Sequence, residues 1–228
     1  MNYEQARAYA VNVSRSGSIL GLDSIENLMH ELGDIQERLK IIHIAGTNGK
    51  GSTGAYLERV LIEAGYRVGR YSSPAVFDPM EVWRINLQSM SHEEYADIME
   101  QVKCACDRMV EKGMEHPTIL KWKQQWHFVF YQKKCDYVLL EVGMGGRTDA
   151  TNLIRKPVCS VITSVSMDHM QFLGNTLTEI AQAKAGIIKK DCPVVTIMQK
   201  AEAMEAIKSR GGKAACKAFC CRCFQGVS

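Results

Sequence analysis

Residues 44–52 read Ile-Ala-Gly-Thr-Asn-Gly-Lys-Gly-Ser, between an apolar run and a segment of helical periodicity. This order predicts a buried strand, a tight turn and a helix. The three glycines let the backbone approach an anion closely, and the start of the following helix adds a partial positive charge. Lys50 adds a full positive charge. The stretch therefore predicts a phosphate-binding loop at 46–52.

The spacing of this loop differs from the common P-loop, G-x-x-x-x-G-K-[ST]. Ile44 stands where that pattern has its first glycine, and Gly51 rather than Ser or Thr follows Lys50. Ser52 comes one position later and still offers a hydroxyl near the phosphates. A purely structural glycine turn is the alternative interpretation of these residues.

Around this loop the chain alternates between strand and helix patterns. Strands are expected within 40–46, 66–74, 135–146, 156–169 and 192–197, the last of these being the final clear strand. Helices are expected at 23–33, 53–64, 92–110 and 176–184, and 75–86 reads as an irregular loop. Because apolar strands alternate with amphipathic helices, the sequence predicts an α/β fold with a doubly wound, mainly parallel sheet. In the helix after the loop, the predicted inward stripe is Tyr56, Leu57, Val60, Leu61 and Ala64.

Composition excludes some classes of function. The 228 residues are 46% hydrophobic and 23% charged, as in ordinary globular proteins. A net charge of +3 is too small to predict binding to nucleic acid or to an anionic membrane. The first ten residues lack a secretory leader, and no apolar run is long enough to span a membrane, so we expect a cytoplasmic protein.

Several polar residues stand where parallel sheets place ligands, beyond the carboxyl ends of strands. Glu141 ends an apolar strand and needs a partner, for which Mg²⁺ is well suited; a solvated loop carboxylate is the alternative. His169 also follows a strand, although alone it reads as a histidine satisfied by hydrogen bonds. Lys184 lies on the helix face of Ile180, which predicts partial burial, or else it complements the helix C-terminus. Taken alone, Ser73 and Asp149 are ordinary turn and loop residues.

The pattern G-T-N-G-K-G-S resembles that of the Mur ligase superfamily, and further segments resemble its folylpolyglutamate synthase/dihydrofolate synthase branch. They lie at 42–52, 65–78, 135–152 and 164–189. Within them, Gly-Arg-Thr-Asp-Ala-Thr-Asn and Ala-Lys-Ala-Gly-Ile-Ile-Lys favour the folate branch over the enzymes that act on cell-wall precursors. A ligase for UDP-linked cell-wall substrates is therefore a weaker alternative.

The resemblance implies an ATP-dependent ligase: ATP phosphorylates a folate carboxylate, and the amine of L-glutamate attacks the acyl phosphate. It implies ATP and Mg²⁺ as cofactors, folate and glutamate as small-molecule partners, and a monomer. The implied ATP-binding residues are Gly46, Thr47, Asn48, Gly49, Lys50, Gly51 and Ser52. The implied Mg²⁺ ligands are Ser52, Ser73, Glu141 and His169. Lys50 and Lys184 are implied to be catalytic, the latter as a carbamylated lysine, and Asp149 is implied to contact the pterin.

Two stretches depart from the family pattern, at 119–128 and at 211–228. Shifting the reading frame of plausible codons restores family-like sequence in both, so we interpret them as frame-shifted segments. We expect residues 1–210 to form the ATP-binding domain, without the C-terminal ligase domain. An inactive truncated product that at most binds nucleotide is then the alternative function.

Both aberrant stretches invite other interpretations. The spacing of the tail cysteines does not match a structural zinc site. The remaining five cysteines are expected to be reduced. Trp122 and Trp126, set among cations, fit a packed helix face as well as a nucleic-acid patch.

Overall fold

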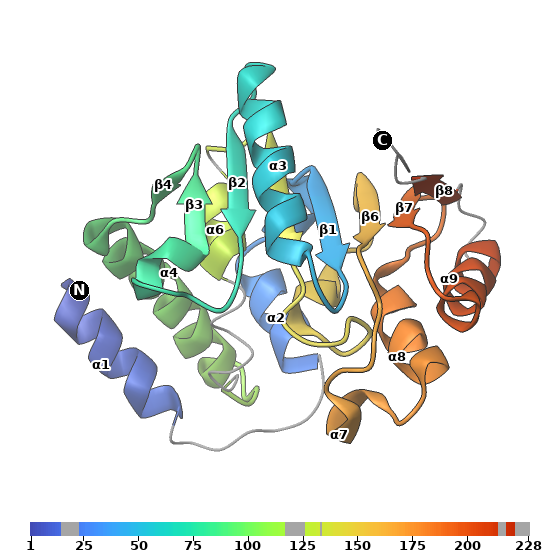
Figure 1. Ribbon diagram of the computed structural model, residues 1–228. Helices are drawn as coiled ribbons and strands as arrows, with labels where there is room; N and C mark the ends of the chain where they lie inside the picture. The colour runs from blue at the N-terminus through green and yellow to red at the C-terminus, as the bar shows by residue number, and fades with distance from the viewer. Residues whose placement is uncertain (15–22, 117–125, 133, 214–217, 222–228) are drawn as a thin grey trace.

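The computed structural model describes residues 1–14, 23–116, 126–132, 134–213 and 218–221 (Figure 1). Most of the stretch at 119–128 and much of the tail, including Cys216 and Cys223, lie outside these residues. Within the described part of the chain, no helix combines the length and apolar character needed to cross a membrane.

The centre of the fold is a sheet whose strand order is β4-β3-β2-β5-β1-β6-β7-β8. The strands are β1 (Ile41–Ala45), β2 (Val68–Tyr71), β3 (Trp83–Ile85), β4 (Gln88–Ser89), β5 (Tyr137–Glu141), β6 (Cys159–Ile162), β7 (Val194–Ile197) and β8 (Ala218–Cys221). The ladders from β2 to β8 are parallel, and β3 and β4 add an antiparallel edge. The predicted mainly parallel α/β sheet is confirmed.

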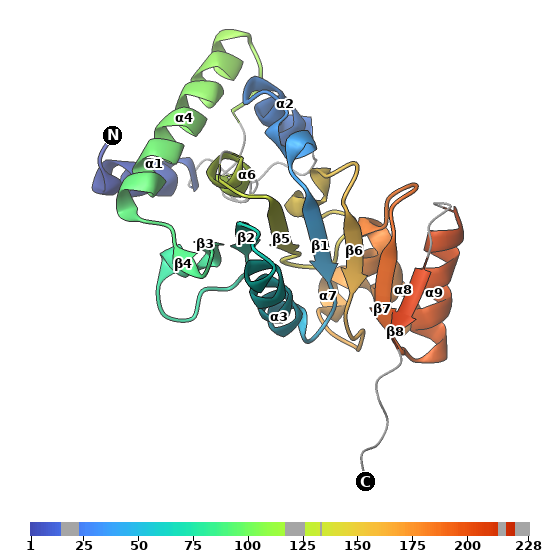
Figure 2. The same cartoon turned by 90° about the horizontal axis from the view of Figure 1, so that it is seen from above.

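The helices cover both faces of the sheet. They are α1 (Tyr3–Ser14), α2 (Asp23–Glu31), α3 (Lys50–Glu63), α4 (His92–Glu111), α6 (Trp126–Tyr131), α7 (Met170–Leu173), α8 (Leu177–Lys184) and α9 (Ala201–Lys213). Short 3-10 helices occur at η1 (Ile35–Arg38), η2 (Pro79–Val82), η3 (Ala150–Leu153) and η4 (Ala185–Ile187). Figure 2 shows α3 against one face and α2, α4 and α6 on the other.

The strand register assigns side chains to these two faces, because paired residues on neighbouring strands point the same way. Ile44 pairs with Glu141 on β5 and with Val161 on β6. Ile44 packs with Leu57 and Leu61 of α3, so all three paired positions lie on the α3 face. The next residue pair, Ala45 and Ile162, lies on the opposite face, where Ile162 packs with α8 and α9.

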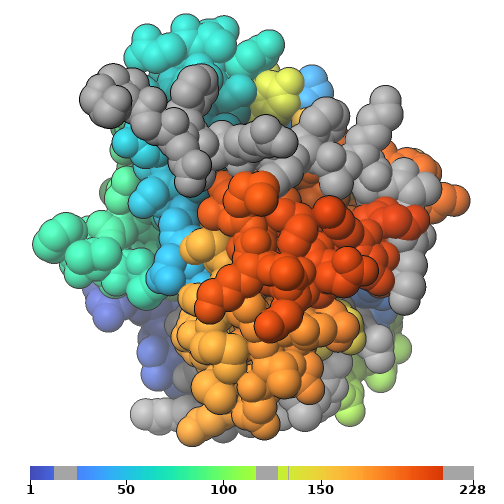
Figure 3. Space-filling model, turned by 45° about the vertical axis from the view of Figure 1, so that its right-hand side comes forward, coloured from blue at the N-terminus to red at the C-terminus, as the bar shows by residue number. Residues whose placement is uncertain are grey.

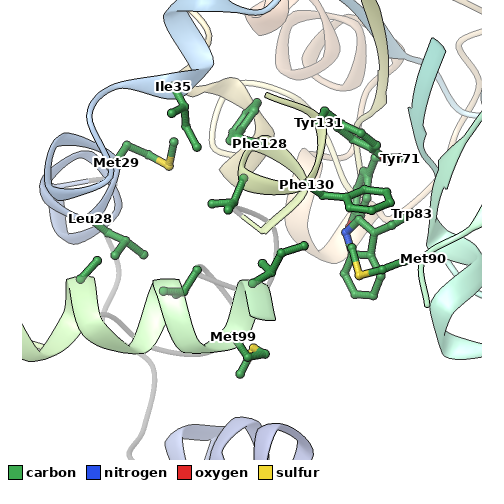
Figure 4. Close-up of a cluster of buried hydrophobic side chains, with 14 of the residues drawn as sticks. Leu28, Met29, Ile35, Tyr71, Trp83, Met90, Met99, Phe128, Phe130 and Tyr131 are labelled. Atoms are coloured by element: carbon green, nitrogen blue, oxygen red, sulfur yellow. The ribbon is translucent and has the colours of Figure 1, made fainter. Parts of the chain in front are cut away.

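The largest apolar cluster lies between the sheet and α1, α2, α4 and α6 (Figure 4). Met29, Met99 and Phe128 are fully or almost fully buried in it. Gly69 of β2 gives room to Tyr131 of α6, because a Cβ at residue 69 would lie 2.5 Å from the tyrosine ring. The Tyr131 hydroxyl donates to the backbone oxygen of Arg70. A glycine in a central strand is therefore what lets α6 pack closely on the sheet.

The prediction of an irregular loop at 75–86 was wrong for its second half. Trp83 and Ile85 lie in β3, which pairs antiparallel with β2, and β4 follows. The turn between β3 and β4 contains Asn86 and Leu87 with φ of 48° and 69°. Such hairpin turns are recognised by Asn-Gly, and Leu87 in place of glycine concealed the signal.

Three other expectations need correction. Tyr56 and Val60 of α3 are exposed, at 77% and 63%, whereas Glu58 is fully buried. Ala64 of the same predicted stripe is exposed, and so is Val110 of α4, which the helical spacing at 92–110 predicts to face inward. The strand at 192–197 is not the last, because β8 pairs in parallel with β7.

Candidate active site

The predicted phosphate-binding loop leaves β1 at its carboxyl end and enters α3 directly at Lys50. Gly49 caps this helix with a φ of 84°, a conformation that glycine adopts without strain. A Cβ at Gly46 would lie 1.8 Å from the Thr163 hydroxyl oxygen, so the backbone approaches the segment after β6 more closely than any side chain permits. The backbone N–H groups at the start of α3 are thus free of side-chain caps and suited to an anion.

Hydrogen bonds fasten the loop to the segment after β6. The Thr47 N–H donates to the Ser164 oxygen at 2.7 Å, and the Thr163 hydroxyl donates to the Asn48 oxygen at 2.8 Å. The Thr47 hydroxyl also donates to the Ser166 oxygen at 3.1 Å. Figure 3 shows the light-blue start of α3 beside the orange segment that follows β6. The loop after β1 is therefore held in its conformation by hydrogen bonds to the segment that follows the neighbouring parallel strand, β6.

Two lysines meet at the base of the loop. Lys50 Nζ and Lys184 Nζ donate to the same acceptor, the Gly46 backbone oxygen, at 3.1 and 3.0 Å. Lys184 reaches it from α8 and is only 2% exposed. Burial, and then the charge of Lys50, lower the pKa of Lys184 to about 8. The two cations provide a strongly positive base for a bound anion.

Glu141 lies at the end of β5, on the α3 face, and is 7% exposed. Its Oε2 lies 3.7 Å from the position that a Cβ at Gly51 would occupy. Burial raises the pKa of Glu141, while the charges of Lys50 and Arg70 oppose this effect. The carboxylate therefore faces the first turn of α3, among cations.

A cavity of about 240 Å³ opens beside this carboxylate. Its lining is formed by Gly51, Arg70, Ser72, Ser73, Pro74, Val76, Glu81, Arg84 and Glu141. Ser73 hydrogen-bonds the buried Tyr71, whose pKa is raised to about 12, chiefly by burial. The cavity thus brings the predicted residues Ser73 and Glu141 together with the loop.

His169 lies on the turn between β6 and α7, with a φ of 47°. Its side chain is half exposed, and its Nε2 lies 3.6 Å from Asp168 Oδ2. It does not line the cavity of Glu141 and Ser73. Among the residues that the structure describes, no three His, Cys, Asp or Glu side chains are grouped to hold a metal ion. Of the predicted Mg²⁺ ligands, Ser73 and Glu141 line this cavity, whereas Ser52 and His169 lie outside its lining.

Asp149 holds its own loop together. It is 8% exposed, and its carboxylate accepts from the backbone N–H groups of Met144 at 3.0 Å and Thr151 at 2.9 Å, and from the Thr151 hydroxyl. The Thr151 hydroxyl also contacts His43 Nε2 at 2.9 Å. Asp149 does not line the cavity beside Glu141. Its geometry is that of a residue that fixes the segment after β5.

Sequence reasoning missed one polar connection at the site. Arg70 of β2 donates through Nη2 to the Gly51 oxygen at 2.9 Å, and through Nη1 to Glu58 Oε2 at 3.2 Å. Arg70 pairs with Leu139 in the sheet, which places it on the α3 face. A charged residue in a central strand was the available signal, because such a residue needs a buried partner.

The donor set fits a nucleotide phosphate with a hard divalent cation. A glycine loop, a helix N-terminus and two lysines favour phosphate oxygens, and the hydroxyl and carboxylate oxygens of Ser52, Ser73 and Glu141 are of the kind that Mg²⁺ prefers.

Comparison with known proteins agrees with this chemistry. The Mur ligase middle domain model matches residues 44–220. The dihydrofolate synthase/folylpolyglutamate synthase of Bacillus subtilis (strain 168) is 38% identical over 208 residues, covering 90% of this chain and 48% of the relative. The apo form of L. casei FPGS superposes with a TM-score of 0.90 at 33% identity, covering 96% of this chain and 54% of that one. An FPGS-AMPPCP-folate complex gives 0.87 at 33% identity, with the same coverage. The chain spans about half the length of the relatives it matches.

Proposed function

Because the chain belongs to the Mur ligase middle domain family, we propose that it forms the ATP-binding part of a ligase that joins L-glutamate to a folate. One observation supports this proposal most directly: the glycine loop, Lys50, Lys184 and Glu141 all lie at the carboxyl ends of β1 and β5. The names of the relatives and the folate bound by a structural neighbour supply the substrate class.

Each residue has a physical role in this proposal. The backbone N–H groups of 46–52 and Lys50 bind the ATP phosphates, which requires Lys50 to exchange the Gly46 oxygen for a phosphate oxygen. Ser52, Ser73, Glu141 and His169 would hold Mg²⁺ beside these phosphates. When bound, the cation neutralises charge on the transferring phosphoryl group. The cations at the loop further stabilise that charge.

Lys184 has a second role in the proposal. The lowered pKa, about 8, provides the neutral amine that reacts with CO₂ to form a carbamate and release a proton. The resulting carboxylate would orient the cation near Gly46. Asp149 would contact the pterin through Oδ2, which accepts one hydrogen bond from Met144 and has a second acceptor site, while its bonds to Thr151 support the loop.

The test has two stages, both on the purified chain. Calorimetric titration with AMPPCP and Mg²⁺ should show one binding site, and Lys50→Ala should weaken it at least about tenfold, as expected for loss of a charge-assisted contact. ADP release is then measured with tetrahydrofolate, with and without glutamate. Glutamate-dependent release supports the ligase; binding without release supports the nucleotide-binding alternative; no binding contradicts both.

Two controls sharpen this experiment. A UDP-linked cell-wall precursor in place of folate should give no ADP release, and release with it would favour the other branch of the superfamily. Labelled bicarbonate should give a carbamate signal by carbon NMR that Lys184→Met abolishes. We also propose a monomeric, cytoplasmic protein, and sedimentation at assay concentration checks the oligomeric state.

A further inference from the structure

Arg70 connects three parts of the site. From the centre of β2, its guanidinium donates both to the first turn of α3, at the Gly51 oxygen, and to Glu58, two turns further along the same helix. The same side chain lines the cavity that contains Ser73 and Glu141.

The contact with Gly51 fixes a peptide unit of the loop. A trans peptide is planar, so its C=O and its N–H point in opposite directions. Arg70 donates to the C=O of the peptide between Gly51 and Ser52, and the N–H of this peptide, on Ser52, is one of the first four N–H groups of α3, which have no partner within the helix. Gly51 lies in the first turn of α3, where a helix frays most readily and glycine adds backbone freedom, so this additional donor limits the orientations of the peptide.

The contact with Glu58 holds the Arg70 guanidinium in place. Glu58 is fully buried, and its second carboxylate oxygen has no hydrogen-bond partner among the described residues. A buried carboxylate holds its cation firmly, because separation would leave an uncompensated charge. Gly54 makes room for the arginine, since a Cβ there would lie 3.3 Å from Arg70 Nε.

We propose that Arg70 is a positioning residue: anchored by Glu58, it orients the Gly51–Ser52 peptide of the loop for phosphate binding. The inference rests on the proposed nucleotide-binding function. This proposal predicts that Arg70 increases the affinity for nucleotide, in addition to neutralising the charge of Glu58.

Three variants separate positioning from charge neutralisation. Arg70→Leu leaves the Glu58 carboxylate buried without its cation, so the chain should be strongly destabilised or should fail to fold. The double variant Glu58→Leu/Arg70→Leu removes both charges and should unfold at a urea concentration close to that of the wild type. Glu58→Gln keeps an acceptor for Arg70 and serves as the matched control.

AMPPCP affinity, measured with Mg²⁺, gives the decisive result. The double variant should bind at least about tenfold more weakly than the wild type, through loss of the donor to Gly51, whereas Glu58→Gln should bind within about twofold. If the double variant folds and binds as tightly as the wild type, Arg70 only neutralises Glu58 and the proposal is overturned.

Amide hydrogen exchange of 51–54 provides a readout that does not depend on nucleotide. The double variant should exchange these amides faster than the wild type, while amides of 57–62 stay protected. Should the wild type bind no AMPPCP, the proposed function fails, and this exchange still decides: unchanged rates at 51–54 would show that Arg70 does not orient the loop.

Discussion

His43 shows at the residue scale how burial sets protonation. It is fully buried in β1, its Nδ1 has no hydrogen-bond partner among the described residues, and burial lowers its pKa to about 3. An unfolded histidine, with a pKa near 6.5, binds a proton at mildly acid pH, whereas the folded one stays neutral. The unfolded state therefore gains protons first, and stability is lost as the pH falls from 6.5 towards 3.

We predict that His43→Gln has a flatter dependence of unfolding free energy on pH over this range. Relative to its constant value above pH 7, the difference in unfolding free energy between the wild type and the variant should change by up to about 5 kcal/mol near pH 3. Urea unfolding at a series of pH values measures both profiles. Parallel profiles would show that the histidine is protonated inside the fold.

The candidate site shows which residues a sequence can reveal. The glycines, Lys50 and Glu141 were predictable, because each stands at a strand end or in a turn where its chemistry is conspicuous. Arg70 and Glu58 were not, since their partnership joins a strand to a helix and depends on which side of α3 faces the sheet. A helix stripe that included Tyr56 and Val60 assigned the wrong side.

At the scale of the element, α8 carries Lys184 and begins with a capping box. The Thr176 hydroxyl accepts from the Glu179 N–H at 3.2 Å, and Glu179 Oε2 accepts from the Thr176 N–H at 3.0 Å. We predict that Thr176→Ala lowers the free energy of unfolding by about 1 kcal/mol. Thr178→Ala, in the same helical turn but outside the box, should change it by less than about 0.5 kcal/mol.

Urea unfolding of the two variants checks this difference, and equal losses would count against a capping role. Both capping boxes, at Ser91 and at Thr176, were predictable because they depend on residues three apart. The hairpin of β3 and β4 was not, because its turn lacks the expected glycine. β8 was missed because 211–228 was read as an aberrant tail.

At the scale of the whole molecule, the site joins two apolar clusters. One packs beneath β2 and β5 with α2 and α4, and the other packs beneath β6 and β7 with α8 and α9. The loop at 46–52 leaves β1, which lies between β5 and β6. A ligand held there contacts elements that belong to both clusters.

We therefore predict that AMPPCP with Mg²⁺ stabilises the folded chain as one unit. At a hundredfold excess over Kd the gain should be about 2.7 kcal/mol, seen as a single unfolding transition shifted to higher temperature. Calorimetry with and without ligand measures the shift, and Lys50→Ala at the same ligand concentration should show a smaller one. Splitting into two transitions would mean that the clusters unfold independently.

The close packing of Tyr131 against Gly69 has a consequence for engineering this protein. The tyrosine ring fills the space that a side chain on residue 69 would need, so the residue tolerated at either position depends on the residue at the other. Libraries that vary a single site at a time would score both as intolerant. A variant with a larger residue in the strand has to shorten its neighbour in the helix in the same step.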